Sequence, residues 1–252
     1  MFIVTKEWLK QNYGSKDQYQ EADSAKWLNR YGQKVTPELI EEWKVWKHLI
    51  EYQVNTLDIV PKALAMIGQS YRSELEAHRL INLMRVPLAT SYEEALSVAH
   101  PSSILELGVG GDSAISTAVF LCYVEWMKGA LNSVDINPLG KTWERYGKFT
   151  ELWRFKQIPA EDYLSTCIKM GYRFDLVFID TSHSYEPTIK EMSLASEITN
   201  TILMDDALFE GNEPDRLKGG VKKAIADWMF AFEDEWTKTD FWNGMTILLQ
   251  RK

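Results

Sequence analysis

The spacing of hydrophobic positions changes near residue 100 of this chain. Before it, apolar side chains recur at three- and four-residue intervals, as on one face of a helix. Helices are therefore expected over 36–57, over about 71–84 and from Ser91 onward, where Glu94 would complete a capping box. Residues 1–35 are less periodic. We read 1–100 as a helical extension, a lid or a dimer face, and 101–252 as a separate domain.

After residue 100, short apolar runs alternate with helical stretches, which favours a parallel sheet covered on both faces. The fold class predicted is α/β, a doubly wound, mostly parallel, seven-stranded Rossmann-like sheet. Asn243-Gly244 favours a tight reversal, so the last strand is expected to be antiparallel. Strands are expected at 103–107, 130–135, 153–158, 174–180, 201–205, 237–241 and 245–250, and helices at 113–128, 140–150, 161–170, 187–197 and 220–232.

Composition narrows the function classes. The chain has 252 residues, of which 45% are hydrophobic and 25% charged, as in globular proteins. No apolar run approaches the ~20 residues that span a bilayer, and the first ten residues do not resemble a signal peptide; we expect a soluble, cytoplasmic protein. A net charge of −8 argues against a nucleic-acid partner and favours a small-molecule one. Cys122 and Cys167 lack metal-ligand spacing and are expected to be buried and free.

A glycine-rich turn follows the first predicted strand. Gly108, Gly110 and Gly111 permit positive φ and remove side-chain bulk where backbone meets a ligand. The helix that follows would present free N–H groups at the carboxyl edge of the sheet. The turn is typical of a nucleotide-like ligand site, although a tight structural turn has the same pattern.

Acidic residues stand at the carboxyl ends of several predicted strands. Asp135 lies where a carboxylate can accept the hydroxyls of a ribose. Asp180, Asp205 and Asp206 together suit a hard divalent cation such as Mg²⁺. The alternative is that Asp206 caps the following segment and that only one aspartate is functional.

His183 follows Asp180 by three residues, on a loop at the same edge. It is a candidate general base, or a group that orients an acceptor hydroxyl. His48, His78 and His100 have no such context.

With these motifs, residues 100–252 resemble class I S-adenosylmethionine (SAM)-dependent methyltransferases. Glu106–Gly111 is similar to that family's first motif, Asp135 to its ribose-binding acid, and Glu161 falls where the family contacts adenine. Residues 178–186 resemble the "FIDGxHxYE" signature of small-molecule O-methyltransferases and cephalosporin-hydroxylase-like proteins, with Thr181 in place of the glycine. Residues 203–206 resemble the metal-binding segment of catechol-type O-methyltransferases.

The resemblance implies in-line methyl transfer from SAM to an acceptor hydroxyl, assisted by a divalent cation, with Mg²⁺ expected. On this basis Asp180, Asp205 and Asp206 would hold the cation, and His183 and Asp180 would be catalytic. Residues 207–218 would form a lid. The N-terminal helices with Trp43 and Trp46 would either cover the acceptor site or form the interface of a homo-oligomer. The cofactor set would be Glu106, which pairs with the cofactor's amino group, with Gly108, Gly110, Ser113, Asp135, Glu161 and Asp180.

Three other functions stay open at this point. A nicotinamide-dependent oxidoreductase could use a similar sheet, but the turn lacks a clean G-x-G-x-x-G because Ser113 follows Gly110 by three residues. A non-catalytic SAM-binding scaffold or sensor would keep the fold without turnover. N-methylation fits less well, because a metal's main use at such a site is to activate hydroxyls.

Overall fold

The computed structural model describes residues 59, 62–63, 66, 79–109, 114–140, 142, 146–149, 151–211 and 218–252. The elements, in chain order, are α5 (Arg79–Ala99), β1 (Ser103–Leu107), α6 (Ile115–Met127), β2 (Ala130–Asp135), η1 (Gly147–Phe149), β3 (Trp153–Gln157), α8 (Ala160–Met170), β4 (Leu176–Ile179), α9 (Tyr185–Ser196), β5 (Thr201–Met204), α10 (Gly220–Ala231), β6 (Trp236–Phe241), η3 (Trp242–Gly244) and β7 (Thr246–Arg251).

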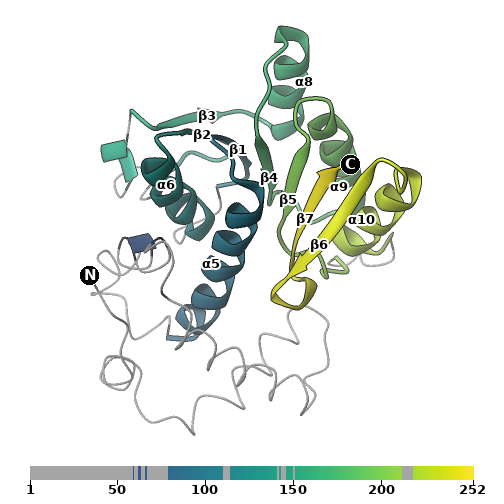
Figure 1. The fold of residues 1–252 in the computed structure, drawn as a ribbon, viewed down its shortest axis with the longest axis horizontal. Coiled ribbons are helices and arrows are strands. Elements are labelled where there is room, and N and C mark those ends of the chain that lie inside the picture. Colours follow the sequence, from purple (N-terminus) through teal and green to yellow (C-terminus); the bar gives the residue numbers. More distant parts are fainter. Residues whose placement is uncertain are drawn as a thin grey trace, which may run out of the picture.

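The strands form one seven-stranded sheet in the order β3-β2-β1-β4-β5-β7-β6 (Figure 1). Strands β1 to β5 pair in parallel, whereas β7 is antiparallel to both β5 and β6. The predicted fold class and the antiparallel last strand are therefore confirmed. Asn243 and Gly244 lie in η3, the reversal between β6 and β7.

Helices cover both faces of the sheet (Figure 1). Alternate strand residues point to opposite faces: Ile104 and Phe178 pack in the cluster that includes α5 and α6, while Leu105 and Val177 pack in the cluster that includes α8, α9 and α10. The central strands β1, β4 and β5 are buried on both faces, which explains why they read as nearly continuous apolar runs. Cys122 and Cys167 are buried and free, as predicted.

Helix α5 differs from the expectation. It runs unbroken through Ser91 and Glu94, so the predicted helix start at Ser91 is wrong. The Ser91 hydroxyl donates to the Leu88 carbonyl at 2.8 Å instead of capping an N-terminus. The predicted helix over 36–57, with Trp43 and Trp46, lies outside the described residues, and that over 140–150 is described only in part, with η1 within it.

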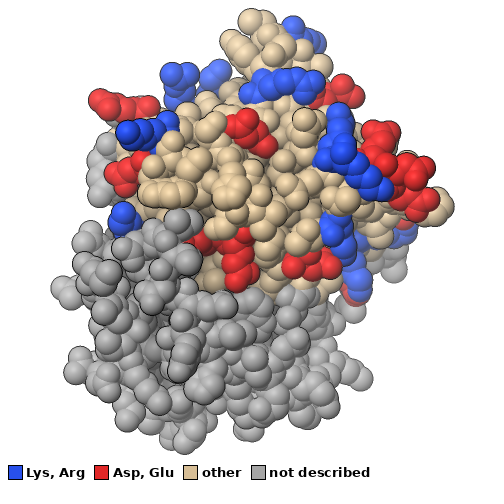
Figure 2. Space-filling view, viewed as in Figure 1, with Lys and Arg blue, Asp and Glu red and all other residues tan. Residues whose placement is uncertain are grey.

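Charged side chains on the face shown in Figure 2 are mixed in sign, with Lys and Arg scattered among Asp and Glu over the described surface. No helix in the described part of the chain is long and apolar enough to cross a membrane.

Candidate active site

Strand register brings the predicted residues to one edge of the sheet. Leu107 at the end of β1 pairs with Val134 of β2 and with Ile179 of β4, and Ile179 pairs with Met204 of β5. The residues that follow these positions, among them Asp135 and Asp180, therefore emerge side by side. Because β1 lies between β2 and β4, this edge is also where the strand order reverses, the usual ligand-binding position in open α/β sheets.

Gly108 joins the turn after β1 to the loop after β4. Its φ is +86°, and a Cβ atom built on it would lie 1.8 Å from the carbonyl oxygen of Asp180. The Asp180 N–H also donates to the Leu107 carbonyl at 2.9 Å. Only glycine permits this contact between the two loops. Gly110 and Ser113, the other predicted cofactor residues of the turn, lie outside the described residues.

Asp135 holds the same turn from the other side. Its Oδ2 accepts the Val109 N–H at 3.0 Å, and its Oδ1 accepts the Asn137 N–H at 2.8 Å. The carboxylate is half-buried. Each carboxylate oxygen can accept more than one hydrogen bond, so Asp135 retains capacity for ribose hydroxyls, and that contact stays a prediction.

Glu106 lies deeper than expected, with no exposed surface. Its Oε1 accepts the hydroxyls of Ser116 at 2.7 Å and Thr117 at 2.9 Å, and its Oε2 accepts the Ser133 hydroxyl at 2.6 Å. Trp153 extends the network by donating its Nε1–H to Ser133 Oγ at 2.9 Å. Burial raises the pKa of Glu106, and the three hydroxyls oppose that shift, which leaves the pKa at about 7.

This network gives Glu106 a role that the sequence did not predict. Glu106 fastens β1 to β2 and to the first turn of α6. It thereby fixes both ends of the glycine turn from beneath. The pairing of Glu106 with a cofactor amino group stays a prediction.

A cluster of possible metal ligands forms next to Gly108. His183 Nε2 lies 2.7 Å from Asp180 Oδ1 and 3.4 Å from Asp206 Oδ2, and one ligand atom from each residue falls within 4.8 Å of the others. His183 and Asp206 both have left-handed backbones, with φ of 53° and 49°. Non-glycine residues rarely adopt this conformation, and it concentrates at functional sites.

The two aspartates determine the charge of His183. Burial of the imidazole opposes its protonation, but the hydrogen bond to Asp180 and the negative charges of Asp180, Asp206 and Asp205 outweigh it and raise the pKa of His183 to about 9. The ring also packs edge-on against Phe209, with centroids 5.7 Å apart. In this arrangement the imidazole carries a proton at neutral pH.

Asp205 is placed differently from the prediction. The expected metal group was Asp180, Asp205 and Asp206, whereas the cluster contains Asp180, His183 and Asp206. Asp205 turns inward, where its Oδ2 accepts the hydroxyl of Tyr92 at 2.7 Å. Its Oδ1 is buried and finds no donor among the described residues. Burial and the charges of Asp206 and Asp180 raise the pKa of Asp205 well above its usual value.

Tyr92 was missed by the sequence reasoning. It lies on α5, is fully buried, and packs its ring against Phe120 and Phe178 at centroid distances of 5.9 and 5.3 Å. Nothing in the sequence connects Tyr92 with Asp205, which is 113 positions away.

Thr181 stands where the resembling signature has glycine. Its hydroxyl donates to Glu191 of α9 at 2.5 Å, which ties the Asp180–His183 loop to that helix. Burial raises the pKa of Glu191, and the Thr181 hydroxyl opposes the shift, which leaves it at about 7. The departure from glycine was the available sequence signal for this contact.

The predicted adenine contact and the predicted lid both remain predictions. Glu161 lies in the first turn of α8 and pairs with Lys190 of α9, so its contact with adenine stays a prediction. Of the predicted lid over 207–218, residues 212–217 lie outside the described part of the chain, and the lid also stays a prediction.

Three carboxylates and an imidazole are collected at this edge, and one carboxylate oxygen, Asp205 Oδ1, has no donor among the described residues. Like charges crowded in a partly buried place are unfavourable unless a cation joins them. Oxygen ligands of this kind are the set that Mg²⁺ and similar hard ions prefer. The residues present therefore fit a divalent cation.

Solved structures of known proteins share the fold of this chain. No family model matches the chain, and no curated protein matches its sequence. The O-methyltransferase from Bacillus cereus, solved with S-adenosylhomocysteine (SAH), is 16% identical over 84% of this chain and 99% of its own, with a TM-score of 0.54. The SAH-bound Podospora anserina methyltransferase PaMTH1 is 14% identical over 87% and 99% of the two chains, with a TM-score of 0.54.

The chain spans about half the length of a third protein, the mycinamycin-pathway methyltransferase MycE solved with Mg and SAH, at 48% of that chain. Its TM-score is 0.48. The two similar structures above have the same fold along nearly their whole length. With its strand order, mostly parallel sheet and single antiparallel insertion, this chain has the fold of class I SAM-dependent methyltransferases.

Proposed function

We propose that this protein is a SAM-dependent methyltransferase that methylates a hydroxyl of a small acceptor with help from a divalent cation. The observation that carries the proposal is the contact of Gly108 with the Asp180 carbonyl. It sets the turn assigned to the methyl donor directly against the loop that bears Asp180 and His183. Methyl transfer depends on such closeness between donor and acceptor.

On the donor side, Asp135 would receive the ribose hydroxyls while its hydrogen bond to Val109 keeps the turn in place. Gly110 and Ser113 would meet the methionine part of the cofactor, and Glu161 the adenine. Glu106 would act beneath the turn by positioning it.

On the acceptor side, Asp180 and Asp206 would hold the cation. Its charge would also stabilise the nearby Asp205 carboxylate, whose Oδ1 has no donor among the described residues. When bound, a divalent cation lowers the pKa of a coordinated hydroxyl and fixes its approach. The charges of Asp180 and Asp206 are what raise the pKa of His183, so their neutralisation leaves the imidazole able to accept the acceptor's proton.

The first test measures which cofactor binds. Calorimetric titration of the full chain should show binding of SAH and none of NAD. Tight NAD binding without SAH binding would overturn the methyltransferase assignment in favour of an oxidoreductase.

The second test measures transfer. Labelled methyl from SAM should move to members of a panel of catechols and polyhydroxylated sugars in the presence of Mg²⁺ and not in the presence of a chelator. His183→Gln should slow transfer about 100-fold, whereas His100→Gln, at an exposed histidine outside the cluster, should not. SAH binding with no transfer to any acceptor would favour the scaffold or sensor.

A further inference from the structure

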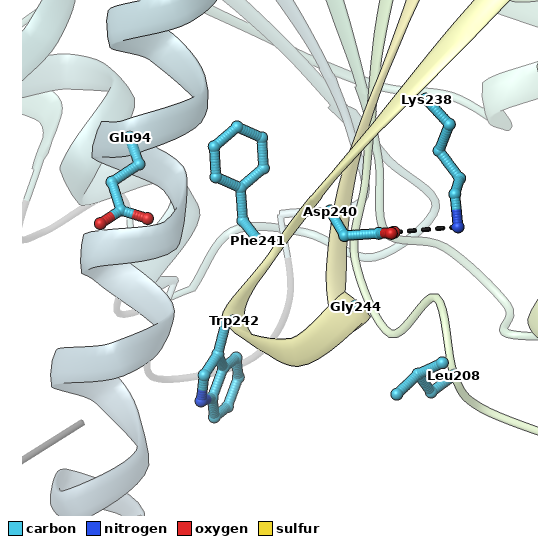
Figure 3. A pocket seen from close by; sticks show the side chains of 7 residues that line it. All are labelled: Glu94, Leu208, Lys238, Asp240, Phe241, Trp242 and Gly244. Atoms are coloured by element: carbon cyan, nitrogen blue, oxygen red, sulfur yellow. Dashed lines mark ion pairs between the residues drawn. The ribbon is translucent and has the colours of Figure 1, made fainter. Parts of the chain in front are cut away.

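A pocket of about 530 Å³ opens beside η3, at the same edge of the sheet as the carboxylate cluster. Figure 3 shows that its walls come from three separate parts of the chain: helix α5, the loop after β5, and the β6–η3 turn. The lining residues used below are Glu94, Leu208, Lys238, Asp240, Phe241 and Trp242.

The loop after β5 connects this pocket to the cluster. Leu208 lines the pocket and follows Asp206 by two residues, so their Cα atoms are at most about 7.6 Å apart. The Ala207 N–H donates to the Met245 carbonyl at 2.8 Å and so holds the intervening loop against the end of the η3 turn.

The charges that line the pocket do not balance. Lys238 is matched by Asp240, with Nζ and Oδ1 2.9 Å apart. Glu94 is half-buried and has neither an ion pair nor a hydrogen bond to its carboxylate among the residues that the structure describes. The Glu94 carboxylate is thus a partly buried negative charge without a counter-charge among the described residues.

The surplus carboxylate shares the pocket with two aromatic side chains, Phe241 and Trp242. Trp242 is only 7% exposed and has a left-handed backbone, with φ of 44°. A fixed aromatic wall and a carboxylate without a partner both favour an organic cation, the wall through its π face and the carboxylate through a charged hydrogen bond.

We propose that this pocket receives the acceptor and selects one that carries a protonated amine on an apolar or aromatic body. The amine would pair with Glu94, the body would lie against Phe241 and Trp242, and the hydroxyl to be methylated would point toward Asp180, His183 and Asp206. The role as an acceptor site rests on the proposed function; the preference for amines does not.

Binding of three matched probes to the full chain tests the preference: phenethylamine, the neutral 2-phenylethanol and the anionic 3-phenylpropionate. Calorimetry or NMR titration should give about tenfold tighter binding of phenethylamine than of 2-phenylethanol, and the weakest binding for 3-phenylpropionate. Glu94→Gln should abolish the preference. Glu93→Gln, which removes the same charge one residue away, should retain it.

Equal affinity of the amine and the alcohol, no binding of the amine, or a preference that survives Glu94→Gln would each overturn the proposal. Urea unfolding of both variants checks that they remain folded, which is expected because the change at Glu94 removes an unpaired, partly buried charge.

The outcomes also separate this proposal from the proposed function. A Glu94-dependent preference for the amine without any methyl transfer would leave an amine site in a protein that is not a methyltransferase. The opposite outcome is also possible. If the protein transfers methyl groups but Glu94→Gln does not change the ratio of KM values for amine-bearing and neutral acceptors, it is a methyltransferase and the proposed amine preference of the pocket is wrong.

Discussion

Two buried carboxylates at the same sheet edge have opposite surroundings. Glu106, on the donor side, is 0% exposed and receives hydroxyl donors on both oxygens. Asp205, on the acceptor side, is 8% exposed and accepts the Tyr92 hydroxyl on Oδ2, while its Oδ1 is buried without a hydrogen-bond partner in the described part of the chain. Asp180 and Asp206 add two further negative charges close to Asp205.

The surroundings of a buried carboxylate distinguish one that holds the fold together from one that is suited to bind a cation. A buried acid with a complete set of donors is already stabilised by the protein and holds neighbouring elements in place. An incompletely satisfied acid among like charges is unfavourable by itself and is stabilised when a cation arrives. The hydrogen-bond donors around each carboxylate thus distinguish Glu106, which joins elements of the fold, from Asp205 and Asp206, which the proposed function places at the cation site.

The largest expected effect comes from breaking the contact that joins the two sides. Gly108→Ala would put a methyl group 1.8 Å from the Asp180 carbonyl oxygen at a φ of +86°, and should lower the free energy of unfolding by about 4 kcal/mol or more. Gly171→Ala has a similar φ of +68° but nothing within 4 Å, and should cost about 1 kcal/mol. Urea unfolding measures both, and equal losses would mean that the loops do not depend on this contact.

The next effect concerns the cation. Asp206→Ala should weaken Mn²⁺ binding about 100-fold, because it removes a proposed ligand, whereas Glu106→Gln should leave the affinity nearly unchanged. Electron paramagnetic resonance of free Mn²⁺ measures both dissociation constants. If both variants lose affinity equally, or if the wild type does not bind Mn²⁺, the contrast between the two carboxylates has no functional meaning.

A smaller loss is expected at Tyr92. Tyr92→Phe keeps the ring but removes the donor to Asp205 Oδ2, and should cost about 2 kcal/mol of stability because a buried carboxylate oxygen loses its donor. Tyr123→Phe is the matched control, since its hydroxyl makes a 3.3 Å bond to the neutral Leu96 carbonyl, and should cost about 1 kcal/mol or less. Thermal or urea unfolding measures the loss of stability in both variants. A Tyr92→Phe variant as stable as the wild type would contradict the hydrogen bond between Tyr92 and Asp205.

The smallest effect is a pH dependence at Glu106. The pKa of Glu106 in the folded state is about 7, above the ordinary 4.5, so its contribution to stability is complete below about pH 4.5 and is lost as the pH rises through 7. Glu106→Gln should therefore become more stable relative to wild type by about 1 to 2 kcal/mol between pH 6 and pH 8. Urea unfolding at both pH values measures the difference, and a relative stability that does not change with pH would show that the carboxyl group is not shifted.

The strands were predictable because their signal is local. The run 130–135 coincides with β2, and the predicted strand at 201–205 ends one residue past β5. The segment 201–204 is an apolar run, as a strand covered by helices on both faces requires, and in 130–135 Leu131, Ser133 and Val134 are buried. The capping-box pattern at Ser91 misled the prediction because the same residues occur in a helix interior, where the Ser91 hydroxyl bonds the Leu88 carbonyl and contacts Thr246 of β7.

The site was predictable where its members are close in sequence. Asp180 and His183 come from one loop and lie together as expected. The Tyr92–Asp205 bond and the pocket at Glu94 depend on α5 packing across the sheet edge, and no periodicity in the sequence encodes such contacts.

The residues that reach the carboxyl edge follow from the local pattern, because a strand's period and the parallel order leave little choice for the position after each strand. The direction in which each carboxylate faces depends on packing between elements. Asp205 and Asp206 are neighbours in sequence, yet one turns inward to Tyr92 and the other lies beside His183. The left-handed backbone at Asp206 and the packing of α5 separate them, and both arise from contacts between distant parts of the chain.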